Sequence, residues 1–320
     1  MISDRVTVIG GGLAGAALAW ALHSRGVSLR WIDDQRPGTA SRIAAGLMTP
    51  ITGKRLAESH RWREFFPVAE GFYRSIEATT GAMFFHARPI IRAFASEAER
   101  GKFDASSDLV GPVDPPVPEG ILAPFGAFAM PGAAQLDVPA YLEASWEHFA
   151  ELGFAEVGSI SDDALSPGER TIFCTGYREP LPIVVRGVSF RPAKGEILTL
   201  RIPGWLDARA FNRRGFWLAP ANEPEVCHFG ATYSWDRLDD VPTEEARREL
   251  VGELEALLNR PYEIVDQRAA VRPIAAGQLP CFGWHDADRR LGYFTGLGSK
   301  GALQAPRFAA AFATELSAGR

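Results

Sequence analysis

The chain is poor in cysteine. Its 320 residues include three, and no two of them form a C-x-x-C pair: Cys174, Cys227 and Cys281. This spacing argues against a disulfide framework and against a cysteine-based zinc site. We therefore expect a reducing, cytoplasmic compartment and no metal centre.

The chain also lacks a long apolar run and a large excess of either charge. No run approaches the ~20 residues that cross a membrane, so no membrane span is expected. Residues 13–22 are apolar enough for the core of a signal peptide, but no cationic segment or convincing cleavage site accompanies them, and they are interpreted as mature structure. The net charge of −5 disfavours nucleic acid as a partner. There is no internal repeat, and the oligomeric state is left open.

What the sequence does contain begins with a β-α-β unit. Val6–Ile9 is a short apolar, β-branched run that predicts a buried strand. Small residues after it predict a helix that ends near Gly26. A second strand follows over residues 27–32 and is closed by Asp33.

A glycine motif joins the first strand to the helix. It has the form G-x-G-x-x-G, at Gly10, Gly12 and Gly15. The first glycine allows a tight turn, the second a close backbone approach to a pyrophosphate, and the third close packing of helix on strand. The helix N-terminus, at Leu13 and Ala14, presents N–H groups to the phosphates. Asp33 lies 18 residues beyond Gly15, where a carboxylate can accept hydrogen bonds from ribose hydroxyls. The motif predicts a dinucleotide site for either NAD or FAD.

Beyond this unit the pattern becomes mixed. Helices are predicted over residues 57–79, 138–152 with Asp137 as cap, 243–258 and 306–316. Strands are predicted over residues 171–175, 195–202, 215–218, 226–232 and 291–295. The proline-rich segment 111–124 predicts a surface loop or a crossing between domains.

Four segments together resemble the D-amino-acid oxidase and glycine oxidase superfamily of FAD-dependent amine oxidoreductases. The first is the glycine motif. The second, residues 38–50, is similar to the small-residue segment that runs under the flavin, and its candidate contacts are Ser41, Arg42, Ala45, Gly46 and Leu47. The third is the strand that ends at Thr175 and Gly176. The fourth is Val271-Arg272-Pro273 with a later return to the cofactor at Gly298, Ser299, Lys300 and Gly301.

The resemblance implies non-covalent FAD. Ala45 and Gly46 allow a flat ring to approach the backbone, and N–H donors at the start of the last helix would stabilise negative charge on the reduced flavin. Cys281 does not match the expected flavin attachment position, and Cys174 lies within an apolar strand, where it is interpreted as a small buried hydrophobic residue. NAD is the rival cofactor, but an N-terminal NAD domain would not require the glycine-rich return near residue 298. Val157 is the one candidate assigned to the adenine.

The resemblance also assigns two catalytic candidates. Arg272 would pair with a substrate carboxylate, the alternative being a surface or interdomain ion pair. Lys300 would place a cation near the flavin, the alternative being a solvated lysine or one that caps backbone groups. Tyr233, Trp217 and Arg214 fall in the substrate region, where core packing is the other interpretation of the two aromatic residues. The isolated His228 and His285 are expected to be structural.

The implied fold is α/β. A Rossmann-like FAD-binding domain with a parallel sheet and helices would combine residues 1–84, 138–192 and 268–320. A discontinuous α+β substrate-binding domain with a mainly antiparallel sheet would combine residues 85–137 and 193–267. The implied reaction is hydride transfer to flavin N5 from the carbon that bears an amine, in an amino acid or secondary amine. Water would hydrolyse the resulting imine, and oxygen or another electron acceptor would reoxidise the flavin.

Two alternatives remain. Residues 45–50 resemble the oxidoreductase domain of a tRNA-modifying enzyme that acts on a carboxymethylaminomethyl-uridine group, and Gly53-Lys54-Arg55 supplies local basic charge. The overall acidity and the lack of an attached methyltransferase domain count against this alternative. The other is an FAD-binding protein without amine oxidase activity.

Overall fold

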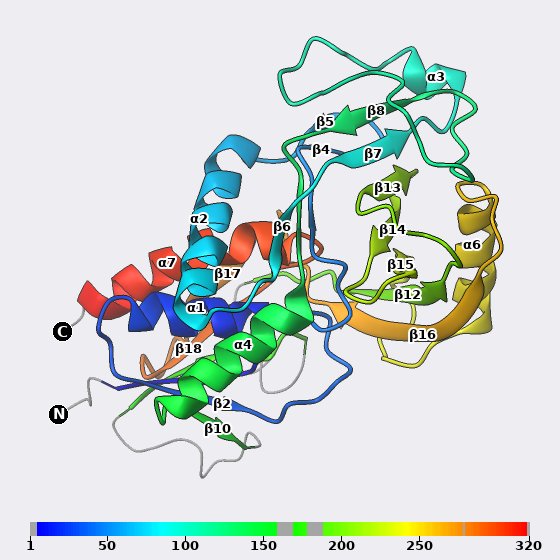
Figure 1. Ribbon diagram of the computed structural model, residues 1–320. Coiled ribbons are helices and arrows are strands. Elements are labelled where there is room, and N and C mark those ends of the chain that lie inside the picture. Colours follow the sequence, from blue (N-terminus) through cyan, green and yellow to red (C-terminus); the bar gives the residue numbers. More distant parts are fainter. Residues whose placement is uncertain (1–4, 159–168, 178–187, 278, 319–320) are drawn as a thin grey trace.

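The structure is a computed structural model, and it describes residues 5–158, 169–177, 188–277 and 279–318. Two large sheets organise the fold (Figure 1). We call the first the parallel sheet, because its strands are parallel except at one edge. Its spatial order is β10 (Ala155–Val157), β2 (Leu29–Asp33), β1 (Val6–Ile9), β11 (Arg170–Phe173), β18 (Leu291–Thr295) and β17 (Cys281–Trp284).

Three long helices pack on the parallel sheet: α1 (Leu13–His23), α4 (Val138–Glu151) and α7 (Gly301–Ala318). A fourth, α2 (Trp62–Thr80), packs against α7, α4 and β6. Helix α1 is buried from Leu13 to Leu22 because its alanines let neighbouring elements approach on every side. Helix α4 begins where its cap was predicted, since Asp137 Oδ1 accepts a hydrogen bond of 3.2 Å from the Ala140 N–H.

The second sheet, which we call the antiparallel sheet, contains one parallel pair, β13 with β7. Its order is β16 (Glu263–Arg272), β12 (Ala193–Arg201), β15 (Val226–Gly230), β14 (Phe216–Pro220), β13 (Ala210–Arg213), β7 (Ile90–Ala93) and β8 (Ala127–Met130). Helix α6 (Glu244–Glu255) covers one face of it with Ala246, Leu250 and Leu254. Most of its other residues are charged, and they are half-buried or exposed.

Smaller elements connect the two sheets. A three-stranded sheet contains β3 (Leu47–Met48), β9 (Ala134–Leu136) and β6 (Phe85–Ala87). A short ribbon contains β4 (Ile51–Thr52) and β5 (Ala57–Glu58), and α3 (Glu97–Arg100) lies beyond it. In the described part of the chain, no helix has both the length and the apolar character to cross a membrane.

The expected fold class is confirmed: a mostly parallel sheet with helices and a mainly antiparallel sheet. Two helix starts differ from the prediction. Residues 57–61 are not helical, because Ser59 is tied to the preceding segment through its N–H to Pro50 O and its hydroxyl to Thr49 O. Helix α7 starts at Gly301, before Pro306. The predicted domain boundaries stay a prediction, and the one at residue 267 falls within β16.

The early start of α7 leaves one carbonyl to be satisfied. Pro306 has no N–H, so the Ala302 carbonyl four residues earlier loses its helical partner. The Tyr73 hydroxyl of α2 donates a hydrogen bond of 2.8 Å to that oxygen instead. A side chain from a neighbouring helix thereby makes a proline tolerable inside α7.

Candidate active site

A cavity of about 1250 Å³ lies between the two sheets. One wall is the glycine turn after β1 and the start of α1, at the carboxyl ends of the parallel strands, which is the usual ligand position in such sheets. The opposite wall is the antiparallel sheet, which contributes Gly195, Ile197, Trp217, Gly230 and Arg272. A cavity with both walls has room for a dinucleotide and a second, smaller molecule.

Most of the predicted site residues line this one cavity. They are Gly10, Gly12, Leu13, Ala14, Asp33, Ser41, Ala45, Gly46, Leu47, Thr175, Gly176, Arg272, Gly298, Ser299, Lys300 and Gly301. Three do not: Gly15, Arg42 and Val157. Gly15 has a packing position, since a Cβ there would be 1.8 Å from Gly10 O. The Val157 side chain is 68% exposed, and its neighbour Gly158 lines the cavity instead.

Asp33 is part of the glycine turn itself. Its carboxylate accepts hydrogen bonds from the N–H groups of Gly11 (2.5 Å) and Gln35 (2.7 Å). Burial raises the pKa of this carboxyl, and the two backbone bonds oppose that rise. A carboxylate has about four acceptor positions, so Asp33 keeps capacity for ribose hydroxyls. Gly11, between the motif glycines, also matters: a Cβ there would be 2.5 Å from Asp33 Cγ.

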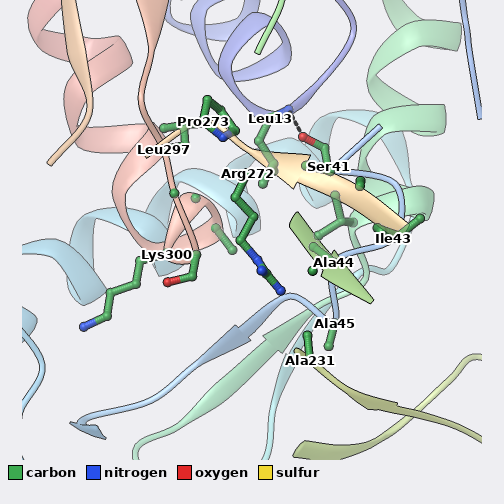
Figure 2. A pocket seen from close by; sticks show the side chains of 18 of the residues that line it. Leu13, Ser41, Ile43, Ala44, Ala45, Ala231, Arg272, Pro273, Leu297 and Lys300 are labelled. Atoms are coloured by element: carbon green, nitrogen blue, oxygen red, sulfur yellow. Dashed lines mark hydrogen bonds between the residues drawn. The ribbon is translucent and has the colours of Figure 1, made fainter. Parts of the chain in front are cut away.

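Residues 38–50 pass beside the start of α1. The Ser41 hydroxyl accepts a hydrogen bond of 3.1 Å from the Leu13 N–H (Figure 2). The helix N-cap, Gly12, has no side chain to cover this end, and a Cβ there would be 2.9 Å from Ser41 Oγ. Gly46 has φ +67°, and a Cβ there would be 1.8 Å from Leu136 O. Only glycine lets the segment pass this close to β9.

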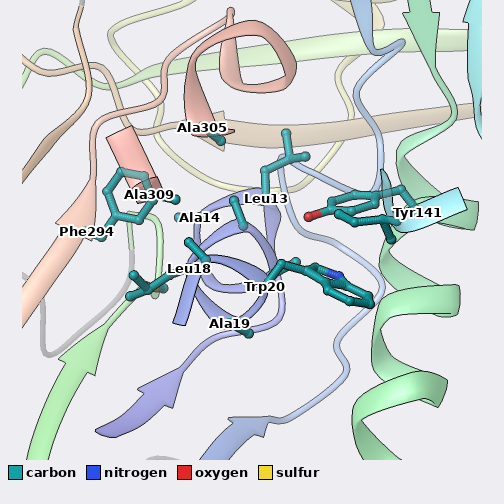
Figure 3. Close-up of a cluster of buried hydrophobic side chains, with 14 of the residues drawn as sticks. Leu13, Ala14, Leu18, Ala19, Trp20, Tyr141, Phe294, Ala305 and Ala309 are labelled. Carbon is teal, nitrogen blue, oxygen red and sulfur yellow. The ribbon is translucent and has the colours of Figure 1, made fainter. Parts of the chain in front are cut away.

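The glycine-rich return brings a second helix N-terminus to the cavity. Gly301 starts α7, and the position of a Cβ on it would be 3.0 Å from Leu13 Cδ1, so α7 begins beside the start of α1. Figure 3 shows α1 packed between Ala305 and Ala309 of α7 and Tyr141 of α4. The Thr295 hydroxyl donates to Gly176 O at 3.1 Å, which joins the return to the third predicted segment. Two helix N-termini therefore direct positive potential at one region.

Arg272 extends from the end of β16 into the cavity (Figure 2). Its Nη1 donates a 3.2 Å hydrogen bond to Thr232 O, and its Cζ lies 4.4 Å from the centroid of the Tyr233 ring. No ion pair found among the described residues includes it. Burial lowers the pKa of this guanidinium, which still stays protonated at neutral pH. The structure therefore presents a partly buried cation that has no carboxylate partner among the described residues.

Lys300 points to a different part of the cavity from Arg272 (Figure 2). Its Nζ is 3.5 Å from Ser59 Oγ, and burial lowers its pKa. It too has no ion pair within the described residues. Lys300 is thus largely enclosed and not a freely solvated lysine.

The substrate-region residues named from the sequence all line the cavity. Tyr233 is 46% exposed, whereas Trp217 is half-buried and also packs against a cluster of buried hydrophobic residues. Arg214 pairs with Glu253 at 2.7 Å. His228 also lines the cavity. Burial together with the charge of Arg268 lowers the pKa of His228 to about 4, so its imidazole is neutral at physiological pH. Gly195 and Gly230 were missed because only strand register, not a motif, brings them to this wall.

Residues 5–315 match the family model described as FAD dependent oxidoreductase, the DAO family. The chain belongs to this family. Its cofactor is FAD, which decides the question that the glycine motif left open. The cavity of this DAO-family protein fits that cofactor, because a side-chain-free turn, two helix N-termini and the Asp33 carboxylate line it together.

Curated relatives and solved structures extend the comparison. The chain is 26% identical over 98% of its length to the tRNA 5-methylaminomethyl-2-thiouridine biosynthesis bifunctional protein of Idiomarina loihiensis, and 27% identical over 99% to that of Maricaulis maris. It spans about half of these relatives, 55% and 53%. Iminodiacetate oxidase from Chelativorans sp. BNC1 is similar in fold (TM-score 0.79, 19% identity, 99% of this chain and 96% of that one). So is glycine oxidase from Bacillus cereus (0.74, 18%, 99% and 95%).

Proposed function

We propose that this protein oxidises the C–N bond of an amine that also bears a carboxylate, with N-substituted glycines as the preferred class. The observation that carries the proposal is Arg272, a cation inside the cavity without a carboxylate partner in the described chain. A planar guanidinium binds a carboxylate through two parallel hydrogen bonds, which fixes the adjacent carbon in one orientation. Two solved structures of similar fold are named for glycine and iminodiacetate, both of which combine an amine with a carboxylate.

Bound FAD supplies the acceptor for a hydride from the carbon next to the amine, and water then hydrolyses the resulting imine. The cofactor would be held by Gly10, Gly12, Asp33, Ala45 and Gly46, with the N-termini of α1 and α7 facing its anionic parts. Arg272 would hold the carboxylate, and the Tyr233 ring would limit where the guanidinium can move.

The substrate would react with its amine uncharged. His228 adds no positive charge beside it, because burial and the charge of Arg268 keep this imidazole neutral at physiological pH. Lys300 would stabilise negative charge that develops during electron transfer. Orientation does most of the work in such a reaction, and no dedicated acid–base pair is required. Either oxygen or another acceptor would then take the electrons.

The comparisons favour a second candidate substrate, a carboxymethylaminomethyl group on a tRNA uridine. The curated relatives carry a tRNA-modification name, and this chain covers about half their length. Such a group is itself an N-substituted glycine, so Arg272 would have the same role. Lys54 and Lys102 line the cavity on the side of α3 and are exposed, which would suit a phosphate backbone.

The test is anaerobic reduction of the purified flavoprotein. We expect glycine, sarcosine or iminodiacetate to bleach the flavin, and Arg272→Met to raise the concentration needed by about a hundredfold, since charged hydrogen bonds contribute 1.5–3 kcal/mol each. Dimethylamine has no carboxylate, so it should bleach the flavin of the wild type and of Arg272→Met equally little. Peroxide formation in air distinguishes oxygen from another acceptor.

If only tRNA that carries the modified uridine reduces the flavin, and salt suppresses the reaction, the second candidate is correct. A flavoprotein that no amine of either class reduces would be one without amine oxidase activity. Protein purified without flavin would contradict the proposal altogether.

A further inference from the structure

Gly195 lies directly beneath the Arg272 guanidinium. It belongs to β12, where it pairs with Ala270 of β16, while Ala193 pairs with Arg272 itself. A Cβ on Gly195 would be 2.1 Å from both Nη atoms of Arg272 and 2.2 Å from its Cζ. These separations are far shorter than any van der Waals contact. The guanidinium therefore occupies the space that any other residue at position 195 would fill.

The strand is held in place by the residues on either side of Gly195. Lys194 and Glu196, on either side of Gly195, point to the opposite face and are 2% and 3% exposed. Lys194 Nζ donates to Asp239 Oδ1 at 2.7 Å and also to the Val241 carbonyl. Glu196 accepts hydrogen bonds of 2.8 and 2.9 Å from Thr243. These hydrogen bonds fix the position of β12 relative to the cavity.

The same network fixes the partners of Arg272. The backbone of Lys194 exchanges hydrogen bonds of 2.8 and 2.9 Å with Ser234, and the Glu196 N–H donates to the Thr232 hydroxyl at 3.0 Å. The segment so attached carries Thr232 O and the Tyr233 ring, the two groups in contact with the guanidinium. β12, residues 232–234 and the Arg272 guanidinium are thus held together, and this leaves no room for a side chain at position 195.

We infer that Gly195 determines specificity for carboxylate substrates, because its missing side chain lets Arg272 lie where it can bind the carboxylate. The inference rests on the proposed function, in which Arg272 is the carboxylate anchor. A methyl group at 195 would displace the end of a flexible side chain, not the backbone, so the fold and the cofactor site would be retained. Gly195 does not have a left-handed φ, and alanine suits a strand there.

The experiment measures the Kd of acetate, a non-reacting carboxylate, from the absorbance change of the bound flavin. We expect Gly195→Ala to weaken acetate binding about ten- to hundredfold, as loss of one or two charged hydrogen bonds would. Flavin content and melting temperature should stay at the wild-type values. Gly252→Ala, on α6 with open space around it, is the matched control and should bind acetate normally.

Repeating the Gly195→Ala substitution in an Arg272→Lys protein separates its effect on Arg272 from any general effect on folding. In Arg272→Lys, whose ammonium is smaller than a guanidinium, adding Gly195→Ala should change acetate binding less than twofold, because the clash is gone. An equal effect in both backgrounds would overturn the role assigned to Gly195. Wild-type acetate affinity in Gly195→Ala, with binding lost in Arg272→Met, would overturn it while leaving the proposed function intact. Unchanged binding in Arg272→Met, or no acetate binding by the wild type, would refute the proposed function itself.

Discussion

At the scale of single residues, the site depends on charged side chains that form only some of their possible hydrogen bonds within the protein. Asp33 accepts two backbone N–H groups and keeps further acceptor capacity, and Arg272 donates to one carbonyl. Buried charged groups normally satisfy all their hydrogen-bonding capacity within the fold. The remaining capacity points toward the cavity, and this is where a ligand gains binding energy.

Asp33→Ala should weaken FAD binding about ten- to hundredfold, because it removes an ionised acceptor for ribose hydroxyls. The dissociation constant can be measured from the recovery of flavin fluorescence on dilution. Asp104→Ala, at an exposed position that does not line the cavity, is the control and should retain FAD. Equal FAD affinity in both variants would contradict a role for Asp33.

The same residue predicts a pH dependence. The pKa of Asp33 is raised in the fold, so the carboxyl takes up a proton at a pH above its usual value of 3.8. The protonated group is the poorer acceptor, and FAD affinity should therefore fall as the pH decreases through this raised pKa. Asp33→Asn should remove that step from a titration of flavin release. A step that persists in the variant would assign it to another group.

At the scale of elements, the sequence predicts those whose own residues specify them. The strand, glycine turn and small-residue helix at the N-terminus are where the pattern placed them, as is the Asp137 cap of α4. The predicted start of α7 was wrong because a proline such as Pro306 usually marks the first turn of a helix. Here the Ala302 carbonyl that Pro306 leaves unpaired accepts a hydrogen bond from Tyr73, which is 229 positions away in the chain. Long-range contacts of this kind leave no local signal.

Tyr73→Phe tests this contact. The variant leaves the Ala302 carbonyl buried without a donor, which should lower the free energy of unfolding by about 1–3 kcal/mol. Tyr262→Phe is the matched control, because its hydroxyl makes a 3.5 Å contact with Glu255 near the surface, and its change should stay below about 0.5 kcal/mol. Urea denaturation of both variants provides the measurement. Equal stabilities would mean that the Tyr73 hydrogen bond is dispensable.

At the scale of the whole molecule, the cofactor contacts predicted from four separate segments meet in one cavity, because β1, β11 and β18 are neighbours in the parallel sheet. The residues that the antiparallel sheet contributes to the cavity were harder to predict from the sequence. Gly195 and Gly230 reach it through the register of β12, β15 and β16, and strand register depends on pairing partners that the local sequence does not name. Arg272 was found only because it belongs to a motif.

We predict that the flavin is not covalently attached, and the intact protein provides the test. Acid precipitation should leave all of the yellow colour in the supernatant, and Cys281→Ser should behave like the wild type. Free FAD at a hundred times its Kd should raise the unfolding free energy by about 2.7 kcal/mol, seen as a higher melting temperature. Colour that stays with the precipitate would indicate attachment.

The burial of α1 on every side has a consequence for biosynthesis. Its partner α7 begins at residue 301, so roughly 280 residues separate the two helices and translation needs on the order of tens of seconds to cover that distance. During this interval the apolar surface of α1 that α7 will cover lacks its permanent neighbour. The contact between the starts of α1 and α7, at Leu13 and Gly301, can form only after α7 has been made, so this part of the cofactor cavity is completed last.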